Sequence, residues 1–586
     1  MINTFPIFLA DQKTKASGKA SHKKALHQLS ACTFAVILII TQLAQATAFD
    51  TIKVTALKNQ FPTLDGSNVN IAVISRSMTY DKGIPLNDYQ PFADHNCFKN
   101  ASLNFHDANN LPANVSSHST AVCAILLGQD PNVTDPDLGK FQYQGITPKA
   151  NAEVYEFWHF LTEYVYTNTP PDADVISISC GEHFQSWWTT GIESLASNFG
   201  KTIIAGIGNG SKSSDPLLYP AASSNVIGVG VVDSVVTDNW QLKLDNFTLP
   251  HSQHSSTGPT QQNTCKPDIV APGNFLTADA NTADLYNPAG DWSSYATPAV
   301  AGVAALLIQQ AKQNPAYDLA LSAEAGNCVI KAILLNSATK LPFWHKGQLT
   351  KDDDHTTPLD YTQGSGMLNA EKAYQTLVAG PFLPGDVNSI GWDLNFLDTN
   401  INEKSYYFTV TNPVENFITA TLSWNRYYEN KYPFARLSQY DTDLKIELWA
   451  IDPNNAKNNY LLDYCDSNND NLEHIFSRMD PNYTNYQLTI SFSPNYRPAE
   501  NIDQPFAVAW DTVEPIDKNN ILFYDLDCDG KVTEEDSMLL LKNWLQNALT
   551  PEKYAIGNIN SDNQIDMQDI DILIKHKNQT ASWLKD

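Results

Sequence analysis

The segment Trp292–Leu307 places a serine-containing turn directly before a long apolar stretch, and it constrains the fold more than any other segment. Its sequence, WSSYATPAVAGVAALL, begins with small polar residues and continues with Ala, Val and Leu at helical spacing. Ser294 would therefore lie at a helix N-terminus, where backbone N–H groups have no intrahelical partner. Such donors stabilise developing negative charge beside a nucleophilic serine. Taken alone, the pattern also fits a serine that only caps a helix.

Two further segments present a polar side chain at the end of an apolar element. His118 opens the run STAVCAILLG, so its imidazole would lie at a second helix N-terminus. The segment Ile203–Asn209, IIAGIGN, is typical of a buried strand that ends in a glycine turn and presents the Asn209 amide. A serine, a histidine and an amide donor at the ends of elements are the parts of a hydrolytic site.

Four more segments follow one another in an order that resembles the subtilisin-like serine proteases, the subtilases. They are Asp174–Gly181 (DVISISCG), Tyr219–Asp233 (YPAASSNVIGVGVVD), Lys266–Gly273 (KPDIVAPG) and Gly364–Ala370 (GSGMLNA). The resemblance covers about residues 60 to 378 and implies an α/β fold, a subtilisin-like parallel sheet with helices on both faces. The alternation of short apolar strands with helical stretches favours the same fold class.

The resemblance also implies roles for individual residues. Ser294 would be the nucleophile of a serine endopeptidase, His118 its general base and Asn209 the side-chain donor to the oxyanion. The edge strand that pairs with an extended substrate would consist of Ser179, Cys180 and Gly181.

One departure from the family falls on the catalytic triad. The strand Val69–Ile74 is followed by Ser75, where subtilases carry an Asp that holds the second ring nitrogen of the histidine and stabilises the imidazolium. Ser75 could orient His118 but cannot neutralise its charge. Loss of this carboxylate in a subtilisin costs about 3 × 10⁴ in kcat and leaves ~10³–10⁴ over water. A carboxylate could instead come from another position in the intervening segment, where Asp81, Asp94 and Asp107 lie.

Other departures from the family indicate that different side chains line the substrate cleft. After His118, Ser119 replaces a family Gly and Ala121 replaces a second His, and Cys123-Ala124 replaces the last pair of small residues. Trp292 replaces the Gly before the nucleophile, where a small residue normally allows close backbone approach. Substrate access is therefore expected to differ from that of an ordinary subtilase.

The N-terminus predicts export. Five lysines precede the apolar run Ala31–Ile40, and Ala46–Ala48 offers small residues for cleavage, so residues 1–48 are interpreted as a signal peptide. A retained membrane anchor is the alternative, although the run is shorter than the roughly 20 residues of a spanning helix. Removing five Lys and one Asp changes the net charge from −27 to −31. Such an acidic chain is not expected to bind nucleic acid, and we expect a secreted, extracellular, periplasmic or cell-surface protein.

Seven cysteines follow the predicted leader, and an odd number cannot all pair within the chain. No CxxC spacing indicates zinc. Single cysteines within apolar runs, such as Cys123 and Cys180, are interpreted as packed thiols. A disulfide between Cys97 and Cys123 stays possible at this stage.

The residue pattern of the sequence changes from about Gly385. Short alternating segments rich in β-branched and aromatic residues predict a β-sandwich over residues 385–513, similar to the jelly-roll modules of secreted proteases. Its tryptophans are expected in the core rather than on a carbohydrate-binding surface. Asp441, Asp443 and Asp470 could hold calcium, but solvated loop carboxylates are the preferred interpretation because a full ligand set is lacking.

The C-terminal segment contains two tandem acidic loops of twelve residues. The first, Asp525–Asp536, has acidic residues at positions 1, 3, 5 and 12 and Gly530 at position 6, a pattern typical of a calcium loop. The second, Asn558–Asp569, has Asn563 at the turn and two neutral ligands, so weaker binding is expected. The predicted Ca²⁺ ligands are Asp525, Asp527, Asp529, Lys531 (through its backbone carbonyl), Asp536, Asn558, Asn560, Asp562, Gln564, Asp566 and Asp569.

Each acidic loop precedes a helix-like run, Ser537–Leu545 and Ile570–Lys577, and no good amphipathic helix enters the first loop. Two loop-then-helix repeats over residues 520–582 resemble a type I dockerin, a helical module that docks enzymes onto cohesin-bearing scaffold proteins. An ordinary EF-hand pair is the alternative. The predicted domains are thus 1–48 (signal peptide), 49–380 (subtilase), 385–513 (β-sandwich) and 520–582 (dockerin-like).

Two classes of function remain open from the sequence. One is a secreted serine endopeptidase that cleaves polypeptides through an acyl-enzyme on Ser294. The other is a peptide-binding pseudoprotease, anchored to a scaffold through its C-terminal module. Ser294, His118 and Asn209 favour catalysis, whereas Ser75 and Trp292 favour binding. The endopeptidase is our primary expectation.

Overall fold

The structure is a computed structural model that describes most of the chain after residue 47. It describes residues 48–580 apart from 78, 83, 109–112, 137, 211–214, 235–248, 251, 412–415, 495–502, 514–522, 528–529, 548–554, 561 and 563. The predicted leader therefore lies outside the described residues, except for Ala48. Within the described part, every helix is too short or too polar to traverse a lipid bilayer.

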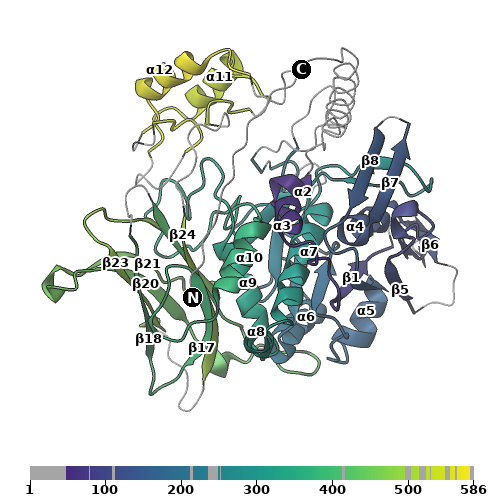
Figure 1. Cartoon of the computed structure of the whole chain (residues 1–586), viewed down its shortest axis with the longest axis horizontal. Coiled ribbons are helices and arrows are strands. Elements are labelled where there is room, and N and C mark those ends of the chain that lie inside the picture. Colours follow the sequence, from purple (N-terminus) through teal and green to yellow (C-terminus); the bar gives the residue numbers. More distant parts are fainter. Residues whose placement is uncertain are drawn as a thin grey trace, which may run out of the picture. The chain divides into compact units, whose positions relative to one another are not determined.

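The first part of the chain contains a seven-stranded parallel sheet with the order β13-β12-β11-β10-β1-β9-β5 (Figure 1). In chain order the strands are β1 (Asn70–Ser75), β5 (Ser102–His106), β9 (Asn151–Glu156), β10 (Val175–Ile178), β11 (Thr202–Gly206), β12 (Ile227–Val232) and β13 (Ile269–Pro272). The predicted α/β parallel sheet is confirmed. Because all strands run parallel, their carboxyl ends meet at one edge of the sheet, where ligands bind in such folds.

Helices cover both faces of this sheet, as the side chains of β1 show. Ile71 and Val73 pack into the core cluster that contains α4 (Ser117–Leu127) and α7 (Ser293–Ala311). Ala72 and Ile74 point the other way, into a cluster with α6 (Trp187–Phe199). With apolar neighbours on both faces, the strands need no polar alternation, which explains their continuous hydrophobic runs.

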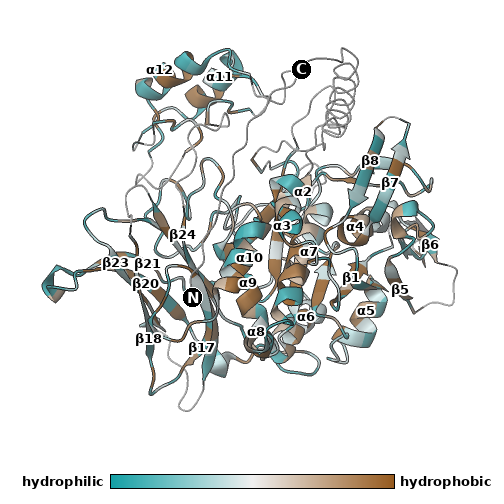
Figure 2. Cartoon of the chain, in the orientation of Figure 1, coloured by the Kyte–Doolittle hydropathy of each residue, from teal (hydrophilic) through white to brown (hydrophobic). Residues whose placement is uncertain are grey.

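The sheet is completed by peripheral elements. The helices are α2 (Ala48–Thr51), α3 (Val54–Gln60), α5 (Phe157–Phe160) with the π-turn η2 (Leu161–Val165), α8 (Pro315–Leu321), α9 (Gly326–Asn336) and α10 (Ala370–Ala379). The short strand pairs are β2 (Tyr80–Asp81) with β3 (Ile84–Pro85), β4 (Asp88–Gln90) with β6 (Asn114–Val115), β7 (Gln129–Asp135) with β8 (Gly139–Gln144), and β14 (Leu276–Ala278) with β15 (Tyr286–Pro288). The β7–β8 hairpin is largely hydrophilic, whereas the sheet strands are hydrophobic (Figure 2).

The next part, from Gly385 to Val513, is a β-rich region of two mostly antiparallel sheets. One sheet contains β16 (Gly385–Asp386), β18 (Glu403–Thr409), β23 (Asn485–Phe492), β20 (Leu444–Ile451) and β21 (Tyr460–Cys465). The other contains β17 (Gly391–Leu397), β24 (Gln504–Val513), β19 (Phe417–Ser423) and β22 (Leu472–Arg478). Residues of both sheets form a single hydrophobic core. The expectation of a core position is confirmed for Trp392, Trp424 and Trp510, because each is at most 1% exposed. Trp449, which was expected in the core as well, is only half-buried.

Buried polar contacts join this β-rich region to the parallel-sheet region. The Asn225 amide donates to the backbone oxygen of Arg426 at 2.7 Å and accepts from its backbone N–H at 2.8 Å. The Thr419 hydroxyl donates to Asn336 at the end of α9, at 3.1 Å. Since these residues are buried, separating the two regions would leave several polar groups without partners, which is costly.

Two helices close the described chain, α11 (Glu534–Lys542) and α12 (Met567–His576). Leu540 of α11 and Leu573 of α12 pack in a small cluster with Phe523, Val532 and Ile565. Phe343 of the parallel-sheet region also joins this cluster, with its ring centroid 5.4 Å from that of Phe523.

The cysteines within the described residues are thiols. Cys97, Cys123, Cys180, Cys265, Cys328 and Cys465 are all free. A Cys97–Cys123 disulfide, which the sequence left open, is therefore wrong. Cys528 lies outside the described residues. Burial raises the pKa of Cys123 to about 12, so this thiol packs as a small apolar group.

Candidate active site

Ser294 is the second residue of α7, as the sequence predicted, and is half-buried. Its hydroxyl donates to the backbone oxygen of Ser179 at 3.1 Å, and the Ser179 hydroxyl donates to the backbone oxygen of Ser294 at 2.8 Å. The nucleophile candidate is thus fastened to the residue that follows β10. The N-terminal turn of α7 directs its unpaired N–H groups and the positive end of its dipole toward this serine.

Asn209 lies beyond the carboxyl end of β11, and Ser293 fixes the orientation of its amide. The side-chain oxygen of Asn209 accepts from the Ser293 backbone N–H at 2.8 Å and from the Ser293 hydroxyl at 2.9 Å. Two donors on this oxygen distinguish it from the NH₂ group, which therefore faces away from Ser293. Sequence analysis missed Ser293, although its place directly before the nucleophile was a signal.

His118 is the second residue of α4, and its ring lies beside Tyr295 of α7, with the centroids 5.8 Å apart. Its Nδ1 is buried and has no hydrogen-bond partner among the described residues. Burial lowers the pKa of His118 to about 4, because no carboxylate compensates for desolvation of the imidazolium. The ring is therefore neutral near pH 7 and can accept a proton, but the cation that it forms is not stabilised.

Ser75 does not contact His118 through a hydrogen bond. It is 2% exposed and shares a short hydrogen bond with the hydroxyl of Ser119, which is fully buried. The two departures noted in the sequence are thus coupled, since the Ser119 hydroxymethyl occupies space beside the position of the missing carboxylate. Asp94 is exposed, and Asp107 accepts from the Tyr89 hydroxyl at 2.9 Å, so neither serves His118; the Asp81 side chain lies outside the described residues.

The predicted substrate-binding residues Ser179, Cys180 and Gly181 directly follow β10. The next residue, Glu182, exchanges two backbone hydrogen bonds with Tyr219. At Gly181 an added Cβ would lie 2.4 Å from the Tyr219 backbone oxygen, so only glycine fits this close approach. The half-buried Cys180 thiol points back toward the Ile74 oxygen at 3.9 Å.

Trp292 is the N-cap of α7 and is half-buried. Its backbone has φ −136° and ψ 139°, which any residue adopts, so the local conformation does not require the family's glycine. The indole lies close to Gly290, where an added Cβ would be 2.8 Å from its nitrogen. A large side chain at this position is therefore accommodated by a glycine two residues earlier.

The first C-terminal loop gathers three carboxylates. Single oxygens of Asp525, Asp527 and Asp536 lie within 4.8 Å of one another. Ligand oxygens at 2.3–2.6 Å around one Ca²⁺ produce separations up to about this value, so the geometry fits a calcium ion. Gly530 takes the positive φ of 85° that the turn at position 6 needs, and its N–H donates to Asp525 at 2.7 Å. Asp529 lies outside the described residues, and Lys531 forms a backbone bridge with Thr580.

The second loop repeats the backbone pattern with fewer charges. Asp569 accepts from the N–H groups of Ile559 and Asn560 at 2.7 and 3.1 Å, as Asp536 accepts from those of Leu526 and Asp527. Asn558 and Asn560 contact Asp562, and Gln564 donates its backbone N–H to Asp562. Asp566 instead caps α12 by accepting from Gln568 at 2.8 Å. Among the described residues this loop does not gather three acidic groups.

Two aspartates of the β-rich region differ from their sequence interpretation. Asp443 is 1% exposed and Asp470 is 6% exposed, so neither is a solvated loop carboxylate. Asp470 accepts from the backbone N–H of Cys265 at 2.8 Å and so joins the two regions. Asp441 forms an ion pair with Arg436 at 3.0 Å. These roles are structural, since tertiary packing carried the two buried aspartates into the interior.

Comparison with known proteins gives consistent results for the first part of the chain. AprX, a serine protease of Bacillus subtilis (strain 168), is 29% identical over 265 residues, which make up 40% of this chain and 53% of AprX. Thermitase of Thermoactinomyces vulgaris is 26% identical over 257 residues, 42% of this chain and 77% of thermitase. SBT6.1, a subtilisin-like protease of Arabidopsis thaliana, is 26% identical over 49% of this chain and 25% of its own length. The chain thus spans about half of AprX and a quarter of SBT6.1.

The solved structure of the prenylagaramide maturation protease PagA aligns with a TM-score of 0.37 and 23% identity, covering 54% of this chain and 97% of that chain. The model of the subtilase family, peptidase S8, matches residues 41–366, which is more than half of the 586 residues. The matched range includes His118, Asn209 and Ser294. The chain therefore belongs to the subtilase family of serine proteases.

Proposed function

We propose that this chain is a secreted serine endopeptidase that hydrolyses peptide bonds through an acyl-enzyme on Ser294. The observation that carries the proposal is the fixed amide of Asn209. Its oxygen is held by Ser293, the residue next to the nucleophile, so its NH₂ is committed to the oxyanion side. Preorganised donors of this kind supply a large share of transition-state stabilisation in acyl transfer.

In the proposed reaction, the Ser294 hydroxyl leaves the Ser179 oxygen and attacks the scissile carbonyl carbon while His118 takes its proton. The carbonyl oxygen becomes an oxyanion that accepts from the Asn209 NH₂ and from backbone N–H groups at the start of α7. His118 then gives its proton to the leaving amine, and the C–N bond breaks. Water attacks the acyl-enzyme by the same route in reverse and releases the acid product.

The missing carboxylate makes this a slow enzyme. His118 must become positively charged during each proton transfer, yet no residue that the structure describes accepts a hydrogen bond from its buried Nδ1. The expected penalty is on the order of 10⁴ in kcat relative to a subtilase with a full triad. A turnover far below that of related enzymes is therefore part of the proposal.

A peptide-binding pseudoprotease is the second candidate. The observation that favours it is the Ser75–Ser119 hydrogen bond, which satisfies both hydroxyls without reference to His118. The Ser294 hydroxyl is likewise satisfied by Ser179 rather than by His118. In this case the residues after β10 would hold an extended peptide without cleaving it.

A fluorophosphonate probe and an unstructured protein substrate distinguish the two candidates, with the Ser294→Ala variant as the matched control. Labelling at Ser294 together with slow cleavage that disappears in Ser294→Ala would establish the endopeptidase. Absence of labelling in a folded sample would establish the pseudoprotease.

The C-terminal part is proposed to be a dockerin-like calcium module over residues 520–582 that attaches the enzyme to a cohesin-type scaffold. The proposal rests on the repeated loop-then-helix pattern and on the Asp525–Asp527–Asp536 cluster. Residues 1–48 are proposed as a signal peptide, 49–380 as the catalytic domain and 385–513 as a β-sandwich. Secretion would place the loops in a calcium-rich medium.

Chelation tests the calcium part of this proposal. With EDTA, residues 520–582 of the full chain should become sensitive to an added protease, while residues 49–380 stay resistant. Equal resistance with and without chelator would refute the calcium assignment. Binding to a panel of immobilised cohesins in calcium, but not in EDTA, tests the scaffold proposal separately.

A further inference from the structure

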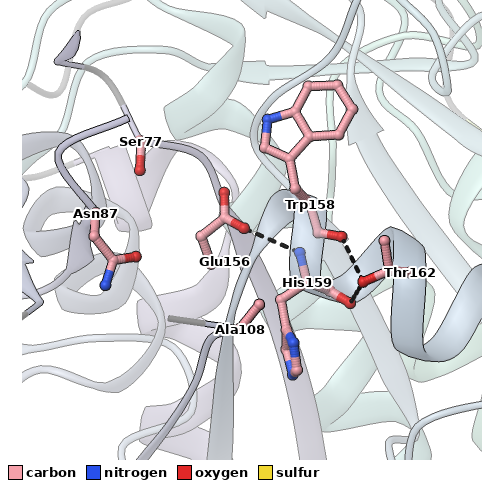
Figure 3. Close-up of a pocket in the computed structure, with 7 residues that line it drawn as sticks. All are labelled: Ser77, Asn87, Ala108, Glu156, Trp158, His159 and Thr162. Atoms are coloured by element: carbon pink, nitrogen blue, oxygen red, sulfur yellow. Dashed lines mark hydrogen bonds between the residues drawn. The ribbon is translucent and has the colours of Figure 1, made fainter. Parts of the chain in front are cut away.

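A cavity of about 200 Å³ lies at the carboxyl ends of three neighbouring strands of the parallel sheet (Figure 3). Ser77 follows β1, Glu156 ends β9, and Ala108 follows β5. Asn87, directly before β4, closes one side of this cavity. The edge of the sheet at which these strands end is where an open α/β fold binds its ligands.

Buried polar atoms without partners line this cavity. Ser77, Asn87 and Glu156 are 1%, 2% and 6% exposed, yet the Ser77 hydroxyl, the Asn87 Oδ1 and the Glu156 Oε1 make no hydrogen bond within the described part of the chain. In Figure 3 the Ser77 hydroxyl and the Asn87 oxygen point into the space between the three side chains, and the Glu156 oxygen without a dashed line lies at the border of this space. Three such atoms around one cavity would be costly unless a ligand satisfied them.

The identity of each atom is fixed by its neighbours. The Asn87 NH₂ donates to Asp107 at 3.4 Å, which turns the amide oxygen to the cavity. The other Glu156 oxygen accepts from the His159 backbone N–H at 3.0 Å and so caps α5. The cavity therefore presents one carboxylate oxygen, one amide oxygen and one hydroxyl, a set suited to a cationic donor. His159 lines the cavity as well, and its buried Nδ1 also has no partner among the described residues.

The electrostatics favour a positive charge in the cavity. Burial raises the pKa of Glu156, and Asp107 adds to the effect, whereas backbone N–H groups and Arg76 only partly oppose it. Arg76 is itself paired with Glu182 at 2.5 Å. A cation beside the free oxygen of Glu156 would offset the desolvation of this carboxylate.

The walls of the cavity suit the hydrocarbon stem of a side chain. Trp158 and Thr162 line it together with Ala108. Trp158 is 43% exposed, so the indole lies at the boundary with solvent. Long basic side chains bury their methylenes along apolar surfaces of this kind and place the charged group on polar partners.

The position of the cavity connects it to the reaction. Glu156 is the Cα partner of Ser75 in the β1–β9 ladder, and Ser77 is two residues beyond Ser75. Ser75 is in turn bonded to Ser119, the neighbour of His118. A polypeptide bound across His118 and Ser294 would therefore pass close to the mouth of the cavity.

We propose that this cavity is a specificity pocket for a lysine or arginine side chain of the polypeptide substrate, held by Glu156, Asn87 and Ser77. The inference rests on the proposed function, because it requires a polypeptide in the cleft. A lysine ammonium has three N–H donors and no acceptor, which matches the three unpartnered oxygens. A bound Ca²⁺ is the poorer match, since it takes six to eight oxygen ligands.

The test measures binding rather than turnover. Fluorescein-labelled octapeptides with one lysine moved through otherwise neutral positions, and matched norleucine peptides, are titrated into the full chain carrying Ser294→Ala. At one position lysine should bind about 10- to 100-fold more tightly than norleucine, the range for hydrogen bonds to a charged group. Glu156→Gln keeps the volume and the α5 cap and should abolish this preference. Glu163→Gln, a nearby exposed glutamate on η2, should leave it unchanged.

Several outcomes would overturn the inference. The first is the absence of a lysine preference at every peptide position, and the second is a preference that persists in Glu156→Gln. The third is tryptophan-sensitised Tb³⁺ luminescence that is lost in Glu156→Gln, because this would indicate a metal site instead. If Glu156→Gln does not fold, Asn87→Ala takes its place and should reduce the preference at the same peptide position. A lysine preference in Ser294→Ala together with no cleavage by the parent chain would refute the proposed endopeptidase alone. Cleavage by the parent chain without a lysine preference would refute only the pocket.

Discussion

Two regions place polar side chains at the start of a helix: the surroundings of His118 at α4, which we call the catalytic corner, and the calcium-type loop Asp525–Asp536 at α11. They differ in the charge that they carry. At α4 the carboxylate of the family is absent, two serines bond to each other, and the imidazole is neutral. At α11 three carboxylates lie within 4.8 Å. Asp536 alone accepts N–H groups from Leu526, Asp527 and Thr533.

The difference follows from what compensates for the charge. Around Asp536, backbone donors and the N-terminus of α11 offset much of the repulsion, and a bound cation would offset the rest. Around His118, burial disfavours the imidazolium and no charged group of the described residues opposes this effect. The charge cluster in the loop therefore supports the proposed calcium site, whereas the lack of a carboxylate beside His118 supports the proposal of slow catalysis.

The largest expected effect comes from adding a charge to the catalytic corner. The double variant Ser75→Asp/Ser119→Gly restores the carboxylate and removes the hydroxymethyl that fills its space. We expect kcat to increase by about 10³–10⁴, the reverse of the penalty for losing the triad Asp. Steady-state hydrolysis of an unstructured protein measures this. Ser75→Asn, which adds similar volume without charge, is the control and should give little gain.

Removing the oxyanion donor should have the next largest effect. Asn209→Ala should lower kcat by about 10²–10³, because the oxyanion loses a preorganised N–H donor. Ser293→Ala should cost less, about tenfold, since the Ser293 backbone N–H still holds the amide. Equal losses in the two variants would show that the Ser293 hydroxyl contributes more than orientation.

Removing a charge from the acidic loop Asp525–Asp536 tests whether its carboxylates bind calcium. Asp536→Asn should weaken calcium binding by at least about tenfold, because it removes a charged ligand and replaces one of the two oxygens that accept backbone N–H groups with a donor. Isothermal titration with Ca²⁺ gives the affinity. Glu535→Gln on the same helix is exposed and should bind as the parent does.

The pH dependence of kcat/KM tests the neutral state of His118. The base must be unprotonated, so with a pKa of about 4 the acid limb should fall only near pH 4 and activity should persist at pH 5. In Ser75→Asp/Ser119→Gly the new carboxylate favours the imidazolium, so the limb should move up by about two pH units. An acid limb near pH 6.5 in the parent chain would contradict the buried, unpartnered ring.

The smallest expected effect concerns Asp443, a carboxylate that is 1% exposed. Burial raises its pKa to about 7, Asp466 and Asp470 add to this, and Arg426 opposes it. The folded pKa exceeds the unfolded one, so this group costs stability as pH rises from about 4 to about 7, and the cost is complete above pH 7. Asp443→Asn should increase the free energy of unfolding by about 1–2 kcal/mol at pH 8 and by almost nothing at pH 4. Denaturant unfolding at both pH values checks this.

Much of the fold was predictable because it depends on local pattern. The apolar strand β11, which ends before Asn209, and the helix that contains Ser294 lie close to their predicted bounds, and strands β16 to β24 fall within residues 385–513, the range predicted for the β-sandwich. Burial on both faces of a sheet, or on one, leaves a clear periodicity in the chain. The pairing of sheets around one core in the β-rich region also follows from that alternation.

The candidate site was predictable only in part. Ser294, His118 and Asn209 each lie at the end of an element, and the structure places them at one edge of the sheet and at the helix termini beside it. The partner of Ser75 was not predictable, since a hydroxyl can bond to any neighbour. The interior places of Asp443 and Asp470 were missed because a loop carboxylate carries no local signal of burial.

The sequence by itself pointed to the family and to Ser294 and His118 as the proposed nucleophile and base, with Ser75 at the position of the family's Asp, because these depend on residue identity at fixed points of a known order. Only the tertiary structure decided that Ser119 takes the hydrogen bond of Ser75, that Ser293 orients Asn209, and that Ser77, Asn87 and Glu156 direct unpartnered oxygens into one cavity. The physical reason is that hydrogen bonds and buried charges are settled between residues far apart in the chain. Whether a polar group loses more free energy by desolvation than it gains from its hydrogen-bond partners is decided only when the strands and helices pack together.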